Sequence, residues 1–189
     1  MTDGKLLLFC GPSGSGKTTI VHHLLQTDPR FEFSVSVTTR RKRENETDGV
    51  DYYFVSVDEF RKKIDANEFV EWEEVYQGGY YGTLKAEIAR IWSEGKVPVF
   101  DVDVEGGLKI KEIYGKKLLA VFVRPPSVEE LHKRLTLRNS ESPESFKVRI
   151  EKSEHELTYA FRFDRVIVND ELSFALKEAK LLVNDFLEL

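Results

Sequence analysis

A glycine-rich run near the start of the chain has residue types and spacing that suit the binding of phosphate groups: Gly11-Pro12-Ser13-Gly14-Ser15-Gly16-Lys17-Thr18. Its glycines let the backbone curl, so that successive N–H groups and the positive end of the following helix point at one spot. Lys17 is placed to bridge the outer phosphates of a nucleotide, and the Thr18 hydroxyl is placed to hold Mg²⁺. We therefore predict that this loop, together with Thr19, binds a di- or triphosphate.

A phosphate-binding loop of this kind needs a strand before it and a helix after it, and the sequence predicts both. The apolar run Leu6 to Cys10 predicts a buried strand, and Thr18 to Gln26 predicts a helix. Further apolar runs predict strands at Val97 to Val102, Leu118 to Val123 and Val166 to Val168, with helical patterns between them. This alternation is typical of a parallel sheet covered by helices, so we expect an α/β fold.

Several expected helices carry recognisable end signals. Ser56 to Glu59 and Ser127 to Glu130 both fit a capping box, and Ser142-Pro143 places a proline at a first helical position. A fourth helix has a buried face and a glycine that ends it, marked by Leu84, Ile88, Ile91, Trp92 and Gly95.

Two stretches depart from the alternation. Residues 34–83 hold three runs that look like short antiparallel strands, Ser34 to Val37, Tyr52 to Val55 and Phe69 to Trp72. We expect them to form an inserted lobe. Residues 138–146 are polar and broken by Pro143 between two helices, which predicts a movable flap.

The composition limits the function classes. A chain of 189 residues with 41% hydrophobic residues can bury a full core as one domain. Its net charge of −5 argues against general binding to nucleic acid or a membrane surface, because both are polyanionic. The single cysteine, Cys10, lies in the first strand and is expected to be a small buried hydrophobe. The apolar runs are too short for a signal peptide or a membrane span, so we expect a cytoplasmic protein.

The densest basic run in this acidic chain is Thr38 to Arg43. Such a run is often a solvated face or a localisation patch, but a phosphotransferase must hold a second anion, and guanidinium groups match phosphate oxygens. Tyr52 and Tyr81 can add hydroxyl donors, and packing of these rings on strands is an equally good interpretation of them.

Six separated motifs resemble guanylate kinase, in order and spacing, over essentially the whole chain. They are Phe33 to Arg43, Gly49 to Phe54, Glu68 to Trp72, Tyr81 to Thr83, Asp101 to Asp103 and Val166 to Asp170. Together they are far more specific than the phosphate-binding loop alone. The resemblance implies an ATP:GMP phosphotransferase that uses Mg²⁺, makes ADP and GDP, and accepts dGMP as well.

The resemblance also implies roles for individual residues on the acceptor side. The residues that match those gripping the GMP phosphate are Ser36, Arg40, Arg43, Tyr52 and Tyr81. Those that match the readers of the guanine edge are Glu71 and Thr83. Asp101 and Asp103 match an acidic pair near the acceptor and the magnesium shell, with Asp101 joining Thr18 as a metal ligand. Without the family, carboxylates at a strand end are equally well ion-pair partners or caps, and Glu71 is equally well an exposed strand residue or an ion-pair partner.

Further residues match positions on the donor side and at the transferring phosphoryl group. Arg134 and Arg138 match lid arginines, and their spacing of four places both on one helical face. Arg149 matches an arginine of the following helix, and Asn169 matches the position beside the donor adenine. No general base is expected, because the attacking phosphate is already an anion near neutral pH.

The implied architecture is one guanylate-kinase-like domain built on a P-loop NTPase-type parallel sheet flanked by helices. The expected parts are a core of residues 1–33, 84–125 and 164–189, a mixed α/β GMP-binding lobe of residues 34–83, and a helical lid of residues 126–163. We expect a monomer or weak homodimer whose partners are the small molecules GMP and ATP, with no nucleic acid and no membrane.

The chain departs from the family pattern at a few positions, and two alternative functions stay open. Arg41-Lys42 and Asn45 replace a usual x-Pro pair and a glycine, Glu105 replaces a glutamine, and Asn139 replaces a glycine. The alternatives are a catalytically inactive binding module and a kinase of another small phosphorylated acceptor. The intact Lys17 and Thr18 disfavour the first, and the presence of both Glu71 and Thr83 disfavours the second.

Overall fold

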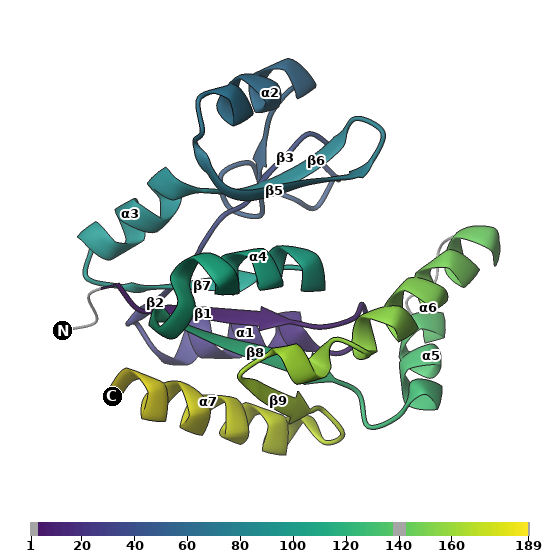
Figure 1. The fold of residues 1–189 in the computed structure, drawn as a ribbon. Helices are drawn as coiled ribbons and strands as arrows, with labels where there is room; N and C mark the ends of the chain where they lie inside the picture. The colour runs from purple at the N-terminus through teal and green to yellow at the C-terminus, as the bar shows by residue number, and fades with distance from the viewer. Residues whose placement is uncertain (1–3, 138–142, 189) are drawn as a thin grey trace.

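A five-stranded parallel sheet forms the centre of the fold in the computed structural model, which describes residues 4–137 and 143–188 (Figure 1). Its strands, in spatial order, are β2 (Phe31–Phe33), β7 (Val97–Asp101), β1 (Leu6–Cys10), β8 (Leu118–Arg124) and β9 (Arg165–Val168). Every neighbouring pair is parallel. The predicted α/β fold is confirmed. Of the central strands, β2 alone was not predicted, a three-residue strand with Glu32 at its centre.

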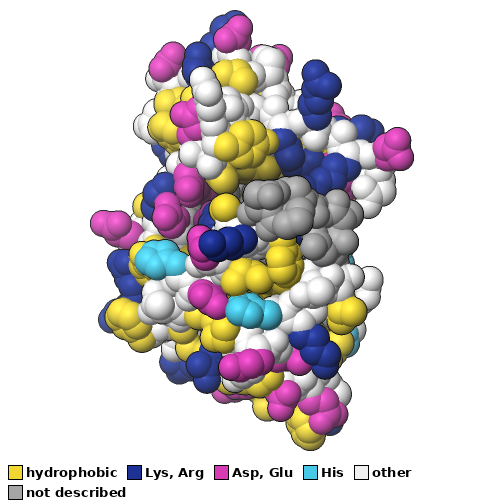
Figure 2. All heavy atoms as spheres, turned by 90° about the vertical axis from the view of Figure 1, so that its right-hand side faces the viewer, with side chains coloured by type: hydrophobic (Ala, Val, Ile, Leu, Met, Phe, Trp, Pro, Cys, Tyr) yellow, Lys and Arg dark blue, Asp and Glu magenta, His cyan; other side chains and the backbone are white. Residues whose placement is uncertain are grey.

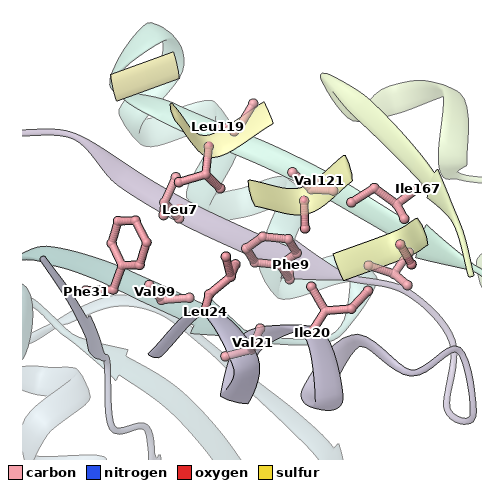
Figure 3. Close-up of a cluster of buried hydrophobic side chains, with 14 of the residues drawn as sticks. Leu7, Phe9, Ile20, Val21, Leu24, Phe31, Val99, Leu119, Val121 and Ile167 are labelled. Atoms are coloured by element: carbon pink, nitrogen blue, oxygen red, sulfur yellow. The ribbon is translucent and has the colours of Figure 1, made fainter. Parts of the chain in front are cut away.

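The central strands are buried on both faces, which is why their sequences are continuous apolar runs. In β1, Leu7 and Phe9 point to one face, and Leu6, Leu8 and Cys10 point to the other. On the first face, Phe9 lies against Ile20 and Leu24 (Figure 3). Burial raises the pKa of the Cys10 thiol well above its usual value, so this residue is the inert hydrophobe that was predicted.

Helices cover both faces of the central sheet (Figure 1). Helices α1 (Lys17–Thr27) and α7 (Leu172–Glu188) pack on one face, and α3 (Lys85–Ser93) and α4 (Val104–Tyr114) pack on the other. Helices α5 (Val128–Leu137) and α6 (Pro143–Leu157) contact each other, and short 3₁₀ turns span Gly115–Lys117 and Ala160–Arg162.

Most of the predicted helix signals are confirmed. Ser56 makes a full capping box with Glu59, and α6 begins at Pro143. Ser127 accepts a hydrogen bond from the Glu130 N–H at 3.2 Å, but the Glu130 side chain bonds Arg134 instead of completing a box. Helix α3 ends at Ser93, and Gly95 follows it with a φ of +73°.

A second sheet lies above α4 in Figure 1 and is built from residues inside the predicted insertion. Its strands, in spatial order, are β4 (Tyr53–Phe54), β3 (Val37–Thr38), β6 (Gly79–Leu84) and β5 (Phe69–Tyr76). Helix α2 (Val57–Asp65) covers it, and Phe60 of this helix stacks on Phe69 with ring centroids 4.4 Å apart. Strand β5 also lies against α4, which brings this sheet to the carboxyl edge of the central one.

The expectation of purely antiparallel strands in this region was wrong. Strands β3 and β4 pair in parallel, although β6 pairs antiparallel with both β3 and β5. A parallel pair needs a long return connection, and residues 39–52 between β3 and β4 supply one. Residues 34–36 are not part of a strand, because here the chain crosses from one sheet to the other.

Charged side chains of both signs are mixed over the face that α5 and α6 present (Figure 2). No helix in the described part of the chain is both long and apolar enough to cross a bilayer.

Candidate active site

The predicted phosphate-binding loop connects β1 to α1 at the carboxyl edge of the central sheet. Gly16 is the N-cap of α1 with a φ of +90°, and no side chain within the described ranges caps this helix. The N–H groups of the first turn are therefore available to an anion, and the helix dipole favours one.

Two close approaches explain why the loop needs glycine. A Cβ at Gly11 would lie 2.1 Å from the Val123 carbonyl oxygen, and a Cβ at Gly16 would lie 2.1 Å from Nδ2 of Asn169. Both positions also have φ values in the region that only glycine adopts freely. The buried Ser15 hydroxyl has no hydrogen-bond partner among the described residues.

Asp101 ends β7 beside this loop, because β1 and β7 pair with Phe9 opposite Asp101. The Thr18 hydroxyl donates to Oδ2 of Asp101 at 2.6 Å, and Nζ of Lys17 lies 3.8 Å from Oδ1. Hydroxyl and carboxylate oxygens are the hard ligands that Mg²⁺ prefers. The described residues hold no cluster of three or more metal-binding side chains, so these two oxygens fit a Mg²⁺ that draws its other ligands from phosphate and water.

A cavity of about 590 Å³ opens between the loop, the second sheet and α6. The predicted site residues that line it are Gly11, Ser13, Gly14, Gly16, Lys17, Thr18, Thr19, Ser36, Arg43, Tyr52, Glu71, Tyr81, Asp101, Asp103 and Arg149. Most of the predicted donor and acceptor residues thus lie around one space, although they come from distant parts of the sequence.

Some predicted residues lie behind the cavity wall instead. Pro12 and Ser15 are buried in the loop, and Thr83 is buried behind Glu71. Asn169 donates from its side-chain amide to the Ser15 carbonyl at 2.9 Å, and Nη1 of Arg134 donates to the Asn169 carbonyl at 3.0 Å. These last two residues therefore brace the loop. Arg138 lies outside the described residues.

Arg40 is not among the residues that line the cavity, and an acidic neighbour engages it. Its guanidinium makes a two-pronged pair with the Glu46 carboxylate, at 2.7 and 2.5 Å, and lies over the Tyr52 ring at 5.0 Å. The hydrogen bond from Arg40 lowers the pKa of Glu46 to about 2. Glu46 also accepts the Arg43 N–H at 2.9 Å, so it closes the basic loop where the family pattern has proline and glycine.

Arg43, in contrast, lines the cavity with an exposed side chain, and no ion pair to another described residue engages it. Tyr52 and Tyr81 pack edge to face with ring centroids 6.0 Å apart. These groups are arranged to receive an anion from the cavity.

Glu71 on β5 is a partly buried carboxylate that lines the cavity. Thr83 on β6 lies opposite it in register and donates to Oε1 at 2.7 Å. Oε2 of Glu71 lies 3.3 Å from the position that a Cβ on residue 106 would take, so Gly106 leaves room beside this oxygen. Burial raises the pKa of Glu71, and no described residue forms an ion pair with it. Glu71 is therefore neither an exposed strand residue nor an ion-pair partner of another described residue.

Helix α6 supplies the predicted Arg149 and three cavity residues that the sequence analysis did not identify, Lys152, Ser153 and Glu156. All four share one helical face and line the cavity. The Arg149 guanidinium donates to Ser13 Oγ in the loop at 3.0 and 3.3 Å. Lys152, Ser153 and Glu156 follow Arg149 by three, four and seven residues, and this helical spacing could have placed them on the same face from the sequence.

Glu156 has an unusual ionisation in this setting. Burial, together with the nearby charge of Asp103, raises its pKa to about 7, against the favourable effect of Lys152 and Lys17. The Lys152 ammonium lies 3.9 Å from both the Glu156 and the Asp103 carboxylates. Glu156 is therefore poorly paired for a carboxylate that is only 12% exposed.

We expect Glu156→Gln to change how stability depends on pH. The folded pKa lies above the unfolded value of 4.5, so Glu156 favours the folded state below pH 4.5, and this contribution is lost as the pH rises through about 7. The variant should gain up to roughly 3 kcal/mol relative to wild type between pH 5 and pH 8, measured by denaturant unfolding. Glu151→Gln, an exposed position on the same helix, is the control. Parallel pH profiles for wild type and Glu156→Gln would contradict the expectation.

Comparison with known proteins decides the family. A sequence model of the family described as guanylate kinase matches residues 3–186. The chain belongs to the guanylate kinase family. It is 49% identical over 184 residues to a guanylate kinase of Bacteroides thetaiotaomicron, covering 97% of this chain and 90% of that protein. It is 45% identical over 187 residues to a guanylate kinase of Salinibacter ruber, covering 99% of each.

A solved structure agrees with this assignment. The crystal structure of guanylate kinase from Anaplasma phagocytophilum superposes with a TM-score of 0.78 at 27% identity, covering 98% of this chain and 87% of that one. The resemblance read from the six motifs is thus confirmed, and these matches to guanylate kinases give no support to the two alternative functions.

Proposed function

We propose that this chain transfers the γ-phosphoryl group of ATP to GMP, making ADP and GDP, in the cavity between the phosphate-binding loop and the second sheet. The observation that carries the proposal is that one cavity is lined both by Lys17 and by Glu71, a partly buried carboxylate with no ion pair to another described residue. The guanylate kinase relatives support the same reaction.

On the donor side, the loop N–H groups and Lys17 bind the ATP phosphates. Thr18 and Asp101 would hold Mg²⁺, which when bound neutralises charge on the phosphate oxygens. Asn169 and Arg134 act on the phosphates indirectly, because their hydrogen bonds fix the loop in place. The donor adenine lies beside Asn169 in this proposal.

On the acceptor side, the phosphate of GMP lies among Ser36, Arg43, Tyr52 and Tyr81. Arg40 reaches it if the phosphate takes over the hydrogen bonds that Glu46 now accepts. The guanine lies toward Glu71, which Thr83 orients, with Asp103 nearby. We propose that residues 34–83 act as the GMP-binding lobe and residues 126–163 as a lid on a core of residues 1–33, 84–125 and 164–189.

The chemistry needs placement and charge neutralisation more than covalent help. A bond forms between a GMP phosphate oxygen and the γ-phosphorus while the bond to the β–γ bridging oxygen breaks, and the negative charge moves to ADP. The attacking phosphate is already ionised, since its second pKa lies near 6, so no base is required. Lys17 and Arg149 are positioned to neutralise the transferring group, with Arg138 as a further candidate outside the described residues.

A coupled assay that offers ATP with GMP, AMP, CMP or UMP tests the proposed function. GMP should be turned over by far the fastest of the four, and dGMP should also react. Comparable rates with another monophosphate, or no turnover of GMP, would overturn the proposal.

Arg43→Ala should weaken the use of GMP more than the use of ATP. Arg43 is a cavity cation with no ion-pair partner among the described residues, and a charge-assisted hydrogen bond is worth about 1.5–3 kcal/mol. KM for GMP should rise by about tenfold or more, with KM for ATP nearly unchanged. Arg41→Ala, a neighbouring exposed arginine outside the cavity lining, is the control. A larger effect on ATP would show that the donor and acceptor sites are reversed.

A further inference from the structure

A buried carboxylate outside the cavity is anchored to the central sheet. Glu87 lies in the first turn of α3, is only 5% exposed, and does not line the cavity. A buried carboxylate is costly unless it is paired, and Arg90 donates to both of its oxygens, at 2.9 and 3.2 Å. Nη2 of Arg90 also lies 2.6 Å from the Glu32 carboxylate in β2. Glu87 is therefore tied through Arg90 to the central sheet.

The Glu87 carboxylate also accepts two hydrogen bonds from residues in or leading to the second sheet. The Val35 N–H donates to Oε1 at 3.4 Å, and the Tyr53 hydroxyl donates to Oε2 at 3.3 Å. Both bonds are longer than the usual 2.7–3.0 Å or so, but the acceptor is charged and buried. Burial, and then the charge of Glu87, raise the pKa of Tyr53, so its hydroxyl keeps the proton that it donates.

The two donors are sequence neighbours of two residues that line the cavity. Val35 precedes Ser36, and Tyr53 follows Tyr52. The Tyr53 N–H also donates to the Ser36 carbonyl at 2.9 Å, so the two segments are joined to each other. Glu87 thus bonds the backbone next to Ser36 and the side chain next to Tyr52.

This place is also where the chain crosses between the sheets. The Ser34 N–H is bonded to the Val99 carbonyl of β7 at 3.0 Å, and β3 of the second sheet begins at Val37. On the return path, β6 runs directly into α3, which carries Glu87. Both crossings therefore meet at the Glu87 side chain.

We propose that Glu87 is a positioning residue for the acceptor phosphate: through Val35 and Tyr53 it holds Ser36 and Tyr52 in place relative to the central sheet. This inference rests on the proposed function of the cavity. Pre-set geometry lowers the ordering cost of binding, so loss of Glu87 should appear in the binding of GMP. Turnover at saturating GMP and the KM for ATP should change little, because the hydrogen bonds of Glu87 to described residues go to Val35, Tyr53 and Arg90 and not to the phosphate-binding loop.

Four single variants and one double variant test the proposal by steady-state kinetics and titration of GMP alone. Glu87→Ala removes both acceptor oxygens, Glu87→Gln keeps one of them, and Tyr53→Phe removes a single donor. Glu94→Gln is the matched control, since Glu94 pairs with the same Arg90 at 2.8 Å but is not bonded to Val35 or Tyr53. The double variant combines Glu87→Ala with Tyr53→Phe.

KM and Kd for GMP should rise about three- to tenfold in Glu87→Ala and less in Glu87→Gln and Tyr53→Phe, with KM for ATP within twofold of wild type. The double variant should be no worse than Glu87→Ala, because both changes break the same bond. A merely structural role would lower the melting temperature without this selective effect, and such a result would overturn the proposal. Equal increases in KM for GMP and ATP, or an unchanged Tyr53→Phe, would also overturn it.

Tyr53→Phe keeps the test decisive if Glu87→Ala fails to fold. Wild-type turnover of GMP is measured first, so that failure of the proposed function is separated from failure of this inference.

Discussion

Lys17→Ala is expected to leave a folded protein whose kcat falls on the order of 10²- to 10³-fold. The Lys17 ammonium lines the cavity at the start of α1 and is 3.8 Å from the Asp101 carboxylate. It is thus placed beside the phosphates rather than in the core, and its main effect is on charge that develops during transfer. Interactions that strengthen in the transition state change kcat more than KM.

The experiment compares kcat and both KM values for Lys17→Ala and for Lys63→Ala. Lys63 lies on α2, where it pairs with Glu68 at 2.8 Å, and it is not part of the cavity. The control variant should keep wild-type kinetics. Unchanged turnover in a correctly folded Lys17→Ala protein would show that the donor phosphates bind elsewhere.

Glu71→Gln is expected to have the second large effect, on the choice of acceptor base. A carboxylate offers only hydrogen-bond acceptors, and guanine presents N1–H and a 2-amino group side by side. Adenine presents a bare N1 and no 2-amino group, so it would leave the buried charge of Glu71 facing a lone pair. Rejecting an analogue that leaves a buried polar group unpaired can be worth roughly 10⁴-fold.

The residues around Glu71 support this expectation. Thr83 occupies Oε1, which fixes the direction of the carboxylate, and Gly106 leaves room near Oε2. The Gln variant keeps the shape but loses the charge and one acceptor. We expect kcat/KM for GMP to fall about 10- to 100-fold, with the affinity for ATP nearly unchanged.

The sequence predicted the parts of the fold that depend on local pattern. The run Leu6 to Cys10 is apolar at every position because both faces of β1 are buried, and the glycines after it require conformations and close approaches that other residues do not permit. The residues of the loop were therefore identifiable one by one, whereas those of the six motifs came from the resemblance to guanylate kinase.

What the sequence did not reveal depends on contacts between distant residues. The parallel pairing of β3 with β4 depends on where the chain returns after residue 52. The periodicity of apolar residues does not predict this return path. The turning of Arg40 toward Glu46 depends on the path of a loop, and the presence of Glu156 in the cavity depends on how α6 packs. Glu87 looked like one more charged residue on a helix, and only its contacts with Val35 and Tyr53 distinguish it.

The most direct test of the account is the ratio of kcat/KM for GMP to that for AMP, measured in wild type, Glu71→Gln and Glu73→Gln. Glu73 lies two positions along β5 and also lines the cavity, so it is a matched control. We predict a strong preference for GMP in wild type and Glu73→Gln, and a ratio about 10- to 100-fold smaller in Glu71→Gln. A Glu71→Gln protein that keeps the full wild-type preference would contradict the account, because guanine would then be read elsewhere.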